Sequence, residues 1–257
     1  MSLLLVRDLA QVVSPAGTET PLRGPALAEL DVIEEAYVLC EDGAVAAVGR
    51  MRDLEPLDGD VIELDGRGRS AVPGLVDCHT HACFAGDRAA EFELRSRGAS
   101  YEELHAAGGG ILSTDPATPG EEALAAAVKK HRGWMLAHGT TTFEAKSGYG
   151  LDRETELSML RAVRQAGGIP TWLGAHAVPP EFPDPDAYLD FALAEVLPEA
   201  ARLAEAADVF VEQGAFDVVQ ARRYLEACRD AGLALRMHAD QFTEAGGVGL
   251  AVELGAR

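Results

Sequence analysis

The arrangement of this chain follows from one segment, Ala71-Val72-Pro73-Gly74-Leu75-Val76-Asp77-Cys78-His79-Thr80-His81. Residues 71–76 form a short apolar run interrupted only by Pro73-Gly74, which predicts a buried strand that begins at a bend. Side chains alternate between the two faces of a strand, so His79 and His81 project to the same side. Two neighbouring imidazoles at the carboxyl end of a strand can bind one metal ion, and Zn²⁺ and Fe²⁺ both accept imidazole nitrogen. The alternative is a pair of unrelated loop histidines.

The composition restricts the classes of function. With 257 residues, 47% of them hydrophobic and 25% charged, the chain can bury a large core. No apolar run approaches the roughly 20 residues of a membrane span, and residues 1–8 lack the basic region of a signal peptide. We therefore expect no contact with a membrane and no export. The formal net charge of −20 would repel a phosphate backbone, which argues against nucleic acid as a partner.

The cysteines indicate the cellular compartment. The chain has four, with neither the spacing of a disulfide framework nor a Cys-x-x-Cys pair. They are Cys40, Cys78, Cys83 and Cys228. Because isolated thiols of this kind are typical of reducing compartments, the sequence predicts a cytoplasmic protein.

Residues 1–70 predict a small β domain. Short β-like runs at 3–6, 36–40 and 44–49 are separated by turn signals. The last two flank Glu41-Asp42-Gly43, where glycine can supply the positive φ of a tight hairpin. No residue pattern in this part suggests chemistry, so we interpret it as a scaffold.

From residue 71 the pattern changes to apolar strands alternating with helical stretches, which predicts βα units and a parallel sheet. Further strands are expected at 140–145, 170–175, 209–212 and 233–237, and helices at 121–137, 152–166, 186–207, 218–231 and 244–254. The polar segment 82–120, which contains Gly108-Gly109-Gly110, is long enough to suggest a functional loop. Five strands fit either an open α/β sheet or an incomplete eight-stranded barrel, and we favour the barrel.

Chemistry-bearing residues follow four of these strands. They are His79 and His81 after the first, 146–150 after the second, His176 at the third and 238–241 at the fifth. In a barrel, the carboxyl ends of the strands meet on one face, where active sites are built. We therefore expect these residues to form one site. The other three histidines, His105, His131 and His138, lie on expected helices or their ends, and a surface role is the simpler interpretation.

Three of these histidines can form a metal centre. His79, His81 and His238 would supply three nitrogens and leave a position for a water, whose pKa a bound Zn²⁺ can lower to about 7. The resulting nucleophile suits attack on a carbonyl or amidine carbon. For His238 the alternative is a core histidine bonded to backbone. We expect His176 to act as a substrate donor or oxyanion stabiliser and not as a ligand.

A resemblance adds to this interpretation. The chain resembles the imidazolonepropionase family of the amidohydrolase superfamily throughout 71–257, in segments at residues 73–81, 84–88, 108–111, 146–151, 174–180 and 238–241. The resemblance implies a TIM-type (β/α)8 barrel, incomplete in this chain, with residues 1–70 as the N-terminal part of a composite β-sandwich. It also implies a hydrolase of histidine degradation, which opens the lactam ring of 4-imidazolone-5-propanoate to give N-formimidoyl-L-glutamate by metal-activated water.

Carried over residue by residue, the resemblance implies that one Zn or Fe ion is bound by His79, His81 and His238. It implies substrate contacts by Arg88, Tyr149, His176 and Gln241, of which His176 and Gln241 are also catalytic. An Arg88 fork can bind the substrate carboxylate bidentately, and Tyr149 can donate a hydrogen bond to it. For Arg88 the alternative is a surface salt bridge with Asp87 or Glu91. Zinc and iron both suit this ligand set, and enzymes of this kind are commonly homodimers.

Two departures from the superfamily pattern matter. Residues 208–213 contain no lysine that could bridge two metals, so we expect one. The superfamily's later histidine, and the aspartate that serves as ligand and acid/base, would follow Arg257. Gln241 cannot replace that acid because an amide does not titrate. We therefore expect the 257-residue chain by itself to bind metal weakly and to hydrolyse little.

Two alternatives stay open. The chain could be another amidohydrolase, such as a nucleobase deaminase or a related lactamase. Deaminases of this superfamily tend to carry an acid soon after the fifth-strand histidine, a place that Gln241 occupies here, although Asp240 lies close. Outside enzymes, the chain could be a catalytically incomplete remnant that binds a ligand without chemistry, and the retention of three metal-type histidines argues against that.

Overall fold

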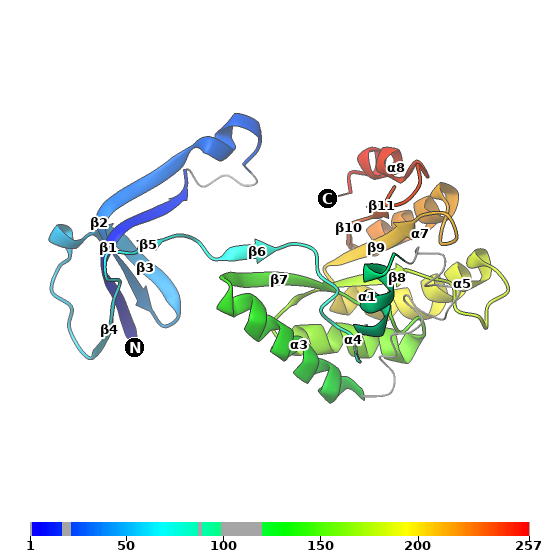
Figure 1. Cartoon of the computed structure of the whole chain (residues 1–257), viewed down its shortest axis with the longest axis horizontal. Coiled ribbons are helices and arrows are strands. Elements are labelled where there is room, and N and C mark those ends of the chain that lie inside the picture. The colour runs from blue at the N-terminus through cyan, green and yellow to red at the C-terminus, as the bar shows by residue number, and fades with distance from the viewer. Residues whose placement is uncertain (1, 17–21, 87–88, 99–119, 257) are drawn as a thin grey trace. The chain divides into compact units, whose positions relative to one another are not determined.

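The computed structural model of the chain describes residues 2–16, 22–86, 89–98 and 120–256 (Figure 1). The chain divides into two compact units, Met1–Gly74 and Leu75–Arg257, and each is considered by itself. None of the described helices is long and apolar enough to cross a membrane.

The first unit is a small five-stranded sheet. Its strands are β1 (Leu3–Pro15), β2 (Leu30–Glu41), β3 (Ala44–Arg50), β4 (Val61–Asp65) and β5 (Ser70–Ala71), with short 3-10 helices at Gly24–Ala28 and Met51–Asp53. The order is β3-β2-β1-β4, and β5 also pairs with β1. β2 runs antiparallel to both β1 and β3, whereas β4 and β5 run parallel to β1.

The predicted hairpin joins β2 to β3. Glu41 pairs with Ala44, and the two residues between them, Asp42 and Gly43, have φ values of 48° and 85°. Positive φ at both central residues matches the right-handed twist of the flanking strands. The sequence Glu41-Asp42-Gly43 was therefore sufficient to predict this turn.

The second unit is built on parallel strands. These are β6 (Leu75–Asp77), β7 (Thr140–Lys146), β8 (Ile169–Ala175), β9 (Ala206–Val211) and β10 (Ala234–Leu235), in the spatial order β10-β9-β8-β7-β6, with β11 (His238–Ala239) pairing further along β9. Helix α3 (Gly120–Ala137) packs on β7, α4 (Arg153–Gln165) on β8 and α7 (Val218–Asp230) on β9. Two shorter helices are α1 (Ala89–Ser96) and α8 (Gly247–Leu254). The predicted α/β class with five successive parallel strand positions is confirmed.

The expectation that the first strand is buried was wrong. Val72, Leu75 and Val76 are 64%, 57% and 66% exposed. β6 starts only after the bend at Pro73-Gly74, has three residues, and lies at the edge of the sheet, where β7 is its only partner among the described strands. One of its edges therefore has no strand partner in the described part of the chain, although its sequence is apolar.

The helix expected at 186–207 is three pieces. These are α5 (Pro185–Phe191), a π-helical turn (Ala192–Val196) and α6 (Leu197–Leu203), and β9 already begins at Ala206. Pro198 lies in the first turn of α6. Because proline has no N–H and its ring clashes with the preceding turn, the helix widens there into the π turn.

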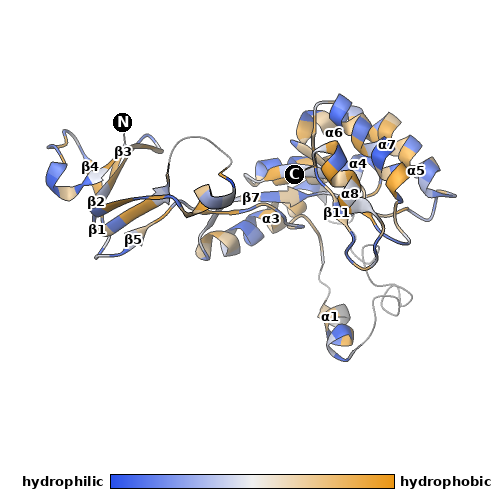
Figure 2. Ribbon diagram, turned by 90° about the horizontal axis from the view of Figure 1, so that it is seen from above, coloured by the Kyte–Doolittle hydropathy of each residue, from blue (hydrophilic) through white to orange (hydrophobic). Residues whose placement is uncertain are grey.

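Hydrogen bonds and packing fix the carboxyl end of β8 in the core. The hydroxyl of Tyr188 donates to the Gly174 carbonyl at 2.7 Å, and the Gly174 N–H donates to the Tyr224 oxygen at 3.1 Å. Trp172 packs beside Tyr224. A Cβ at Gly174 would lie 2.3 Å from the Trp172 ring, so only glycine fits. Figure 2 shows hydrophobic and hydrophilic residues alternating along α4, α6 and α7, as amphipathic covering helices require.

Candidate metal centre

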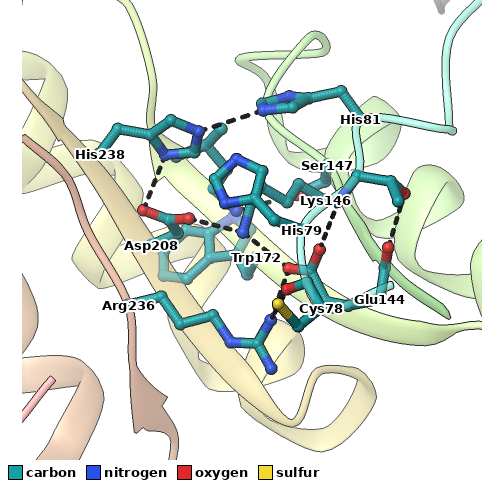
Figure 3. Close-up of polar contacts among 12 residues, drawn as sticks. Cys78, His79, His81, Glu144, Lys146, Ser147, Trp172, Asp208, Arg236 and His238 are labelled. Carbon is teal, nitrogen blue, oxygen red and sulfur yellow. Dashed lines mark hydrogen bonds and ion pairs between the residues drawn. The ribbon is translucent and has the colours of Figure 1, made fainter. Parts of the chain in front are cut away.

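Three histidines from opposite ends of the sheet meet at the carboxyl ends of its strands. His79 and His81 follow β6, and His238 starts β11 (Figure 3). One ring nitrogen of each lies within 4.8 Å of the others, and the Nε2 atoms of His81 and His238 are 3.2 Å apart. His79 is exposed, whereas His81 and His238 are half-buried.

This geometry suits a divalent ion. Two imidazole nitrogens at about 2.05 Å from one tetrahedral ion lie about 3.3 Å apart, which is close to the separation of the two Nε2 atoms. His81 Nδ1 is buried and has no hydrogen-bond partner in the described part of the chain. Burial, followed by the neighbouring His176 and His238, lowers the pKa of His81 to about 3. Burial and then Lys146 also lower the pKa of His79. Neutral rings are what a metal requires, so the lowered pKa values of His79 and His81, together with the spacing of the three rings, fit the ion.

A buried carboxylate orients the third histidine. Asp208 on β9 is 1% exposed, and its Oδ1 lies 3.1 Å from His238 Nδ1. A carboxylate only accepts, so Nδ1 carries the proton and Nε2 presents its lone pair toward His81. Burial alone would raise the pKa of Asp208, but the hydrogen bonds and electrostatic interactions with His238 and then with Lys146 outweigh it and lower that pKa to about 2. Asp208 is therefore a charged anchor of the ring.

A buried lysine links this anchor to β7. Lys146 is fully buried, and its Nζ lies 2.7 Å from both Asp208 Oδ2 and Glu144 Oε1. Arg236 contacts Glu144 Oε1 at 2.9 Å and donates to the Cys78 carbonyl at 3.1 Å, beside His79 (Figure 3). Glu144 also accepts the N–H of Thr80 at 3.0 Å, between the first two histidines. Two acidic and two basic side chains thus hold the backbone around the histidines in place.

Sequence reasoning missed this network. Lys146 was noted only as part of a motif, and Glu144, Asp208 and Arg236 were given no role. A signal was present, because Glu144 and Lys146 are two apart in a strand that is otherwise uncharged, and Asp208 lies within Ala206–Val211. Charged residues on buried strands are rare unless they are paired.

Two of the predicted substrate residues lie beside His81. The ring centres of His81, Tyr149 and His176 are 5.4–6.0 Å from one another. His176 is buried at the end of β8, and its Nδ1 lies 2.7 Å from the Gly148 carbonyl oxygen. A carbonyl only accepts, so Nδ1 is protonated. His176 Nε2 is then an acceptor in the neutral ring and a donor only in the imidazolium.

The structure describes only some of the remaining predicted residues. Gln241 is exposed on the loop after β11, and in the described chain its side chain has no recorded contact with the histidines. Arg88, His105 and the glycines 108–110 lie outside the described residues. His138 is exposed, as expected, whereas the half-buried His131 stacks on Phe84 with ring centres 5.0 Å apart and contacts the Ala82 carbonyl.

No known family model matches the chain, but curated relatives do. Imidazolonepropionases of Rubrobacter xylanophilus, Herpetosiphon aurantiacus and Chloroflexus aggregans are 60%, 45% and 44% identical to it, over 98–99% of this chain. The matches cover 64%, 62% and 64% of those proteins, so the chain spans less than two thirds of their length.

Solved structures support the fold. The ochratoxinase of A. niger superposes with a TM-score of 0.57 at 15% identity, over 99% of this chain and 59% of that one. A molinate hydrolase gives 0.55 at 14% identity, over 99% and 56%. At such identity these structures support the fold alone, which is part of an α/β barrel. The chain is therefore similar in sequence to imidazolonepropionases over 98–99% of its own length, and similar in fold to these solved hydrolases.

Proposed function

We propose that this chain provides the metal centre and part of the substrate site of an imidazolonepropionase. The reaction is the hydrolytic opening of 4-imidazolone-5-propanoate to N-formimidoyl-L-glutamate in histidine degradation. One observation carries the proposal: three histidines converge at the strand ends beside Tyr149 and His176. The 60% identity to the Rubrobacter relative favours this reaction over a nucleobase deamination.

The metal ligands in this proposal are His79, His81 and His238. When bound, a divalent ion supplies an activated water and polarises the amide carbonyl. Asp208 keeps His238 in the tautomer that leaves Nε2 for the ion, and Lys146 keeps Asp208 charged. Zn and Fe both suit three imidazoles, and we propose a single ion.

The substrate contacts in this proposal lie on the other side of His81. Tyr149 donates a hydrogen bond to the propionate carboxylate, and Arg88 binds the same group with its guanidinium fork. His176, held through Nδ1–H by Gly148, accepts a ring N–H when neutral and donates when protonated. Gln241 contacts the ring from the loop after β11. Four free cysteines and metabolic relatives support a cytoplasmic location, and the partner is a small molecule.

Activity is best tested in a chimera, because the chain spans 64% of its Rubrobacter relative. The remaining part of that relative is joined after Arg257, and loss of the imidazolone absorbance is followed with Zn²⁺ or Fe²⁺. We expect hydrolysis at a rate of order 1 s⁻¹ or more, as is typical of enzymes. His81→Ala should abolish it.

The control is His138→Ala, since His138 is exposed and distant from the cluster. It should leave the rate unchanged. A folded, metal-loaded chimera that releases ammonia from guanine or cytosine, and leaves imidazolone propionate intact, would overturn the proposed substrate. Equal activity in the His81→Ala chimera would overturn the proposed metal centre.

A further inference from the structure

We propose that Glu156, on α4, is a positioning residue that fixes the shape of the segment Ser147–Leu151, which presents Tyr149 and holds His176. The importance of those two residues rests on the proposed function. The geometry of the segment itself does not depend on that function.

The carboxylate of Glu156 accepts its hydrogen bonds from this segment. It is 1% exposed, and its Oε1 accepts the N–H groups of Gly148, Gly150 and Leu151 at 3.0, 2.9 and 3.1 Å. Its Oε2 lies 3.0 Å from the same Gly148 nitrogen, and the Ser147 hydroxyl also bonds to the carboxylate. No described hydrogen bond of Glu156 points toward the histidines, so it does not act on a substrate directly.

The segment needs such an anchor because its backbone conformation leaves N–H groups without partners inside the segment. Gly148 has a φ of +98° and Leu151 a φ of 58°, so the chain turns twice through the left-handed region. A left-handed leucine is strained, and buried N–H groups without an acceptor are costly. One buried carboxylate that accepts three N–H groups offsets both costs. Burial raises the pKa of Glu156, and the hydrogen bonds from the segment oppose that rise.

The backbone N–H and carbonyl groups of Gly148 connect Glu156 to the site. The Gly148 N–H donates to Glu156, and its carbonyl accepts from His176 Nδ1 at 2.7 Å. Tyr149 follows directly and is flanked by Gly150, whose N–H is also bound by Glu156. A Cβ at Gly150 would lie 2.7 Å from the Thr155 Cβ, so the segment packs closely on the start of α4. Removing the carboxylate should therefore let the Tyr149 ring move and let His176 exchange between its Nδ1–H and Nε2–H tautomers.

The test compares two substitutions on the same helix of the full 257-residue chain. Glu156→Gln keeps the side-chain size but replaces one carboxylate oxygen by an NH₂ group that cannot accept. The matched control is Glu154→Gln, because Glu154 is exposed on the first turn of α4. Amide hydrogen exchange and ¹⁵N NMR of the imidazoles are measured for both variants, together with Zn²⁺ affinity and the affinity for imidazole-4-propionate.

In Glu156→Gln we expect exchange at Gly148, Gly150 and Leu151 to accelerate about tenfold or more, as loss of a charged hydrogen bond predicts. The His176 ¹⁵N shifts should change from a fixed Nδ1–H tautomer to a mixture. Imidazole-4-propionate should bind about tenfold more weakly. Zn²⁺ affinity should change less than about threefold, because no metal-type histidine belongs to the segment. Glu154→Gln should behave like the unchanged protein.

Unchanged exchange and an unchanged His176 tautomer in a folded Glu156→Gln protein would overturn the proposal. If that variant does not fold, Glu156→Asp, which keeps the charge but withdraws it by one methylene, is measured in the same way; unchanged readouts there overturn the proposal equally. If the exchange and tautomer respond as expected but the parent protein does not bind imidazole-4-propionate, the positioning role stands and the proposed function fails.

Discussion

At the scale of single residues, we expect Asp208 to control how well the three histidines bind a metal. It is the buried acceptor of His238 Nδ1–H and the partner of Lys146. We predict that Asp208→Asn weakens Zn²⁺ binding by about 10–100-fold, the usual effect of losing the group that orients a metal-binding histidine. An asparagine neither stabilises the Nδ1–H tautomer as strongly nor pairs with Lys146. Isothermal titration with Zn²⁺ measures the change.

The control for this prediction is Asp230→Asn, since Asp230 is exposed at the end of α7. It should bind Zn²⁺ as the parent chain does. If Asp208→Asn binds Zn²⁺ with parental affinity, the Asp208 contact is structural only, and the orientation argument is wrong.

The residues of the candidate site were predictable to different degrees. His79 and His81 follow from spacing on a strand, and His238 from its place after the fifth strand. Asp208 and Lys146 could not be paired in advance, because their contact depends on β7 and β9 lying either side of β8. Gln241 lies exposed on the loop after β11, where the neighbouring Phe242 N–H donates to Glu212, and its contact with the substrate stays a prediction.

At the scale of elements, Glu212 anchors the loop after β11. Burial alone would raise its pKa, but hydrogen bonds from the Thr243 hydroxyl and from the N–H groups of Phe242, Gln213 and Thr243 lower it to about 2, from an ordinary 4.5. A lowered carboxyl pKa stabilises the fold above pH 4.5, and that contribution is lost as the pH falls from 4.5 toward 2.

We therefore predict a pH-dependent effect of Glu212→Gln. At pH 7 it should reduce the free energy of unfolding by about 1–3 kcal/mol, which is the range of a hydrogen bond to a charged group. The difference from the parent chain should shrink below pH 4.5, since all other carboxylates titrate in both proteins. Urea unfolding from pH 7 to pH 3 measures it, and a difference that does not depend on pH would contradict the argument.

The segment after β7 gives a second prediction at this scale. Gly148 has a φ of +98°, and a Cβ there would lie 2.7 Å from the Leu173 carbonyl oxygen. Gly148→Ala should therefore destabilise the chain by about 1–3 kcal/mol. Gly133, inside α3, has no atom within 4 Å of its Cβ position, so Gly133→Ala should stabilise the chain by up to about 1 kcal/mol. Opposite changes in Tm confirm both; the same sign for both would contradict them.

Element boundaries were less predictable than element types. The parallel βα order, the Asp152 N-cap and the hairpin at Asp42-Gly43 follow from local sequence, and the structure has all three. The break near Pro198 and the early start of β9 do not, because the alanines around 200–207 favour helix and only pairing with β8 places Ala206 and Ala207 in a strand. The exposure of β6 depends on which strands flank it, which local sequence does not encode.

At the scale of the whole molecule, the histidines join distant parts of one sheet. His79 and His81 follow β6 at one edge, and His238 starts β11, which pairs with β9 beside the other edge. A metal ion bound by all three would cross-link the first and last strands of the second unit. The first unit contributes none of these ligands.

Metal should therefore stabilise the two units unequally. At a free Zn²⁺ concentration of about 100 times Kd, binding contributes about 2.7 kcal/mol to a unit that binds the ion only when folded. We predict that Zn²⁺ slows amide exchange in β6 and β11, that EDTA reverses this, and that exchange in β1 and β2 does not respond. In His81→Ala the effect of Zn²⁺ on β6 and β11 should disappear. Equal protection of both units, or protection that survives His81→Ala, would mean that Zn²⁺ binds elsewhere and that the sheet is not cross-linked through these histidines.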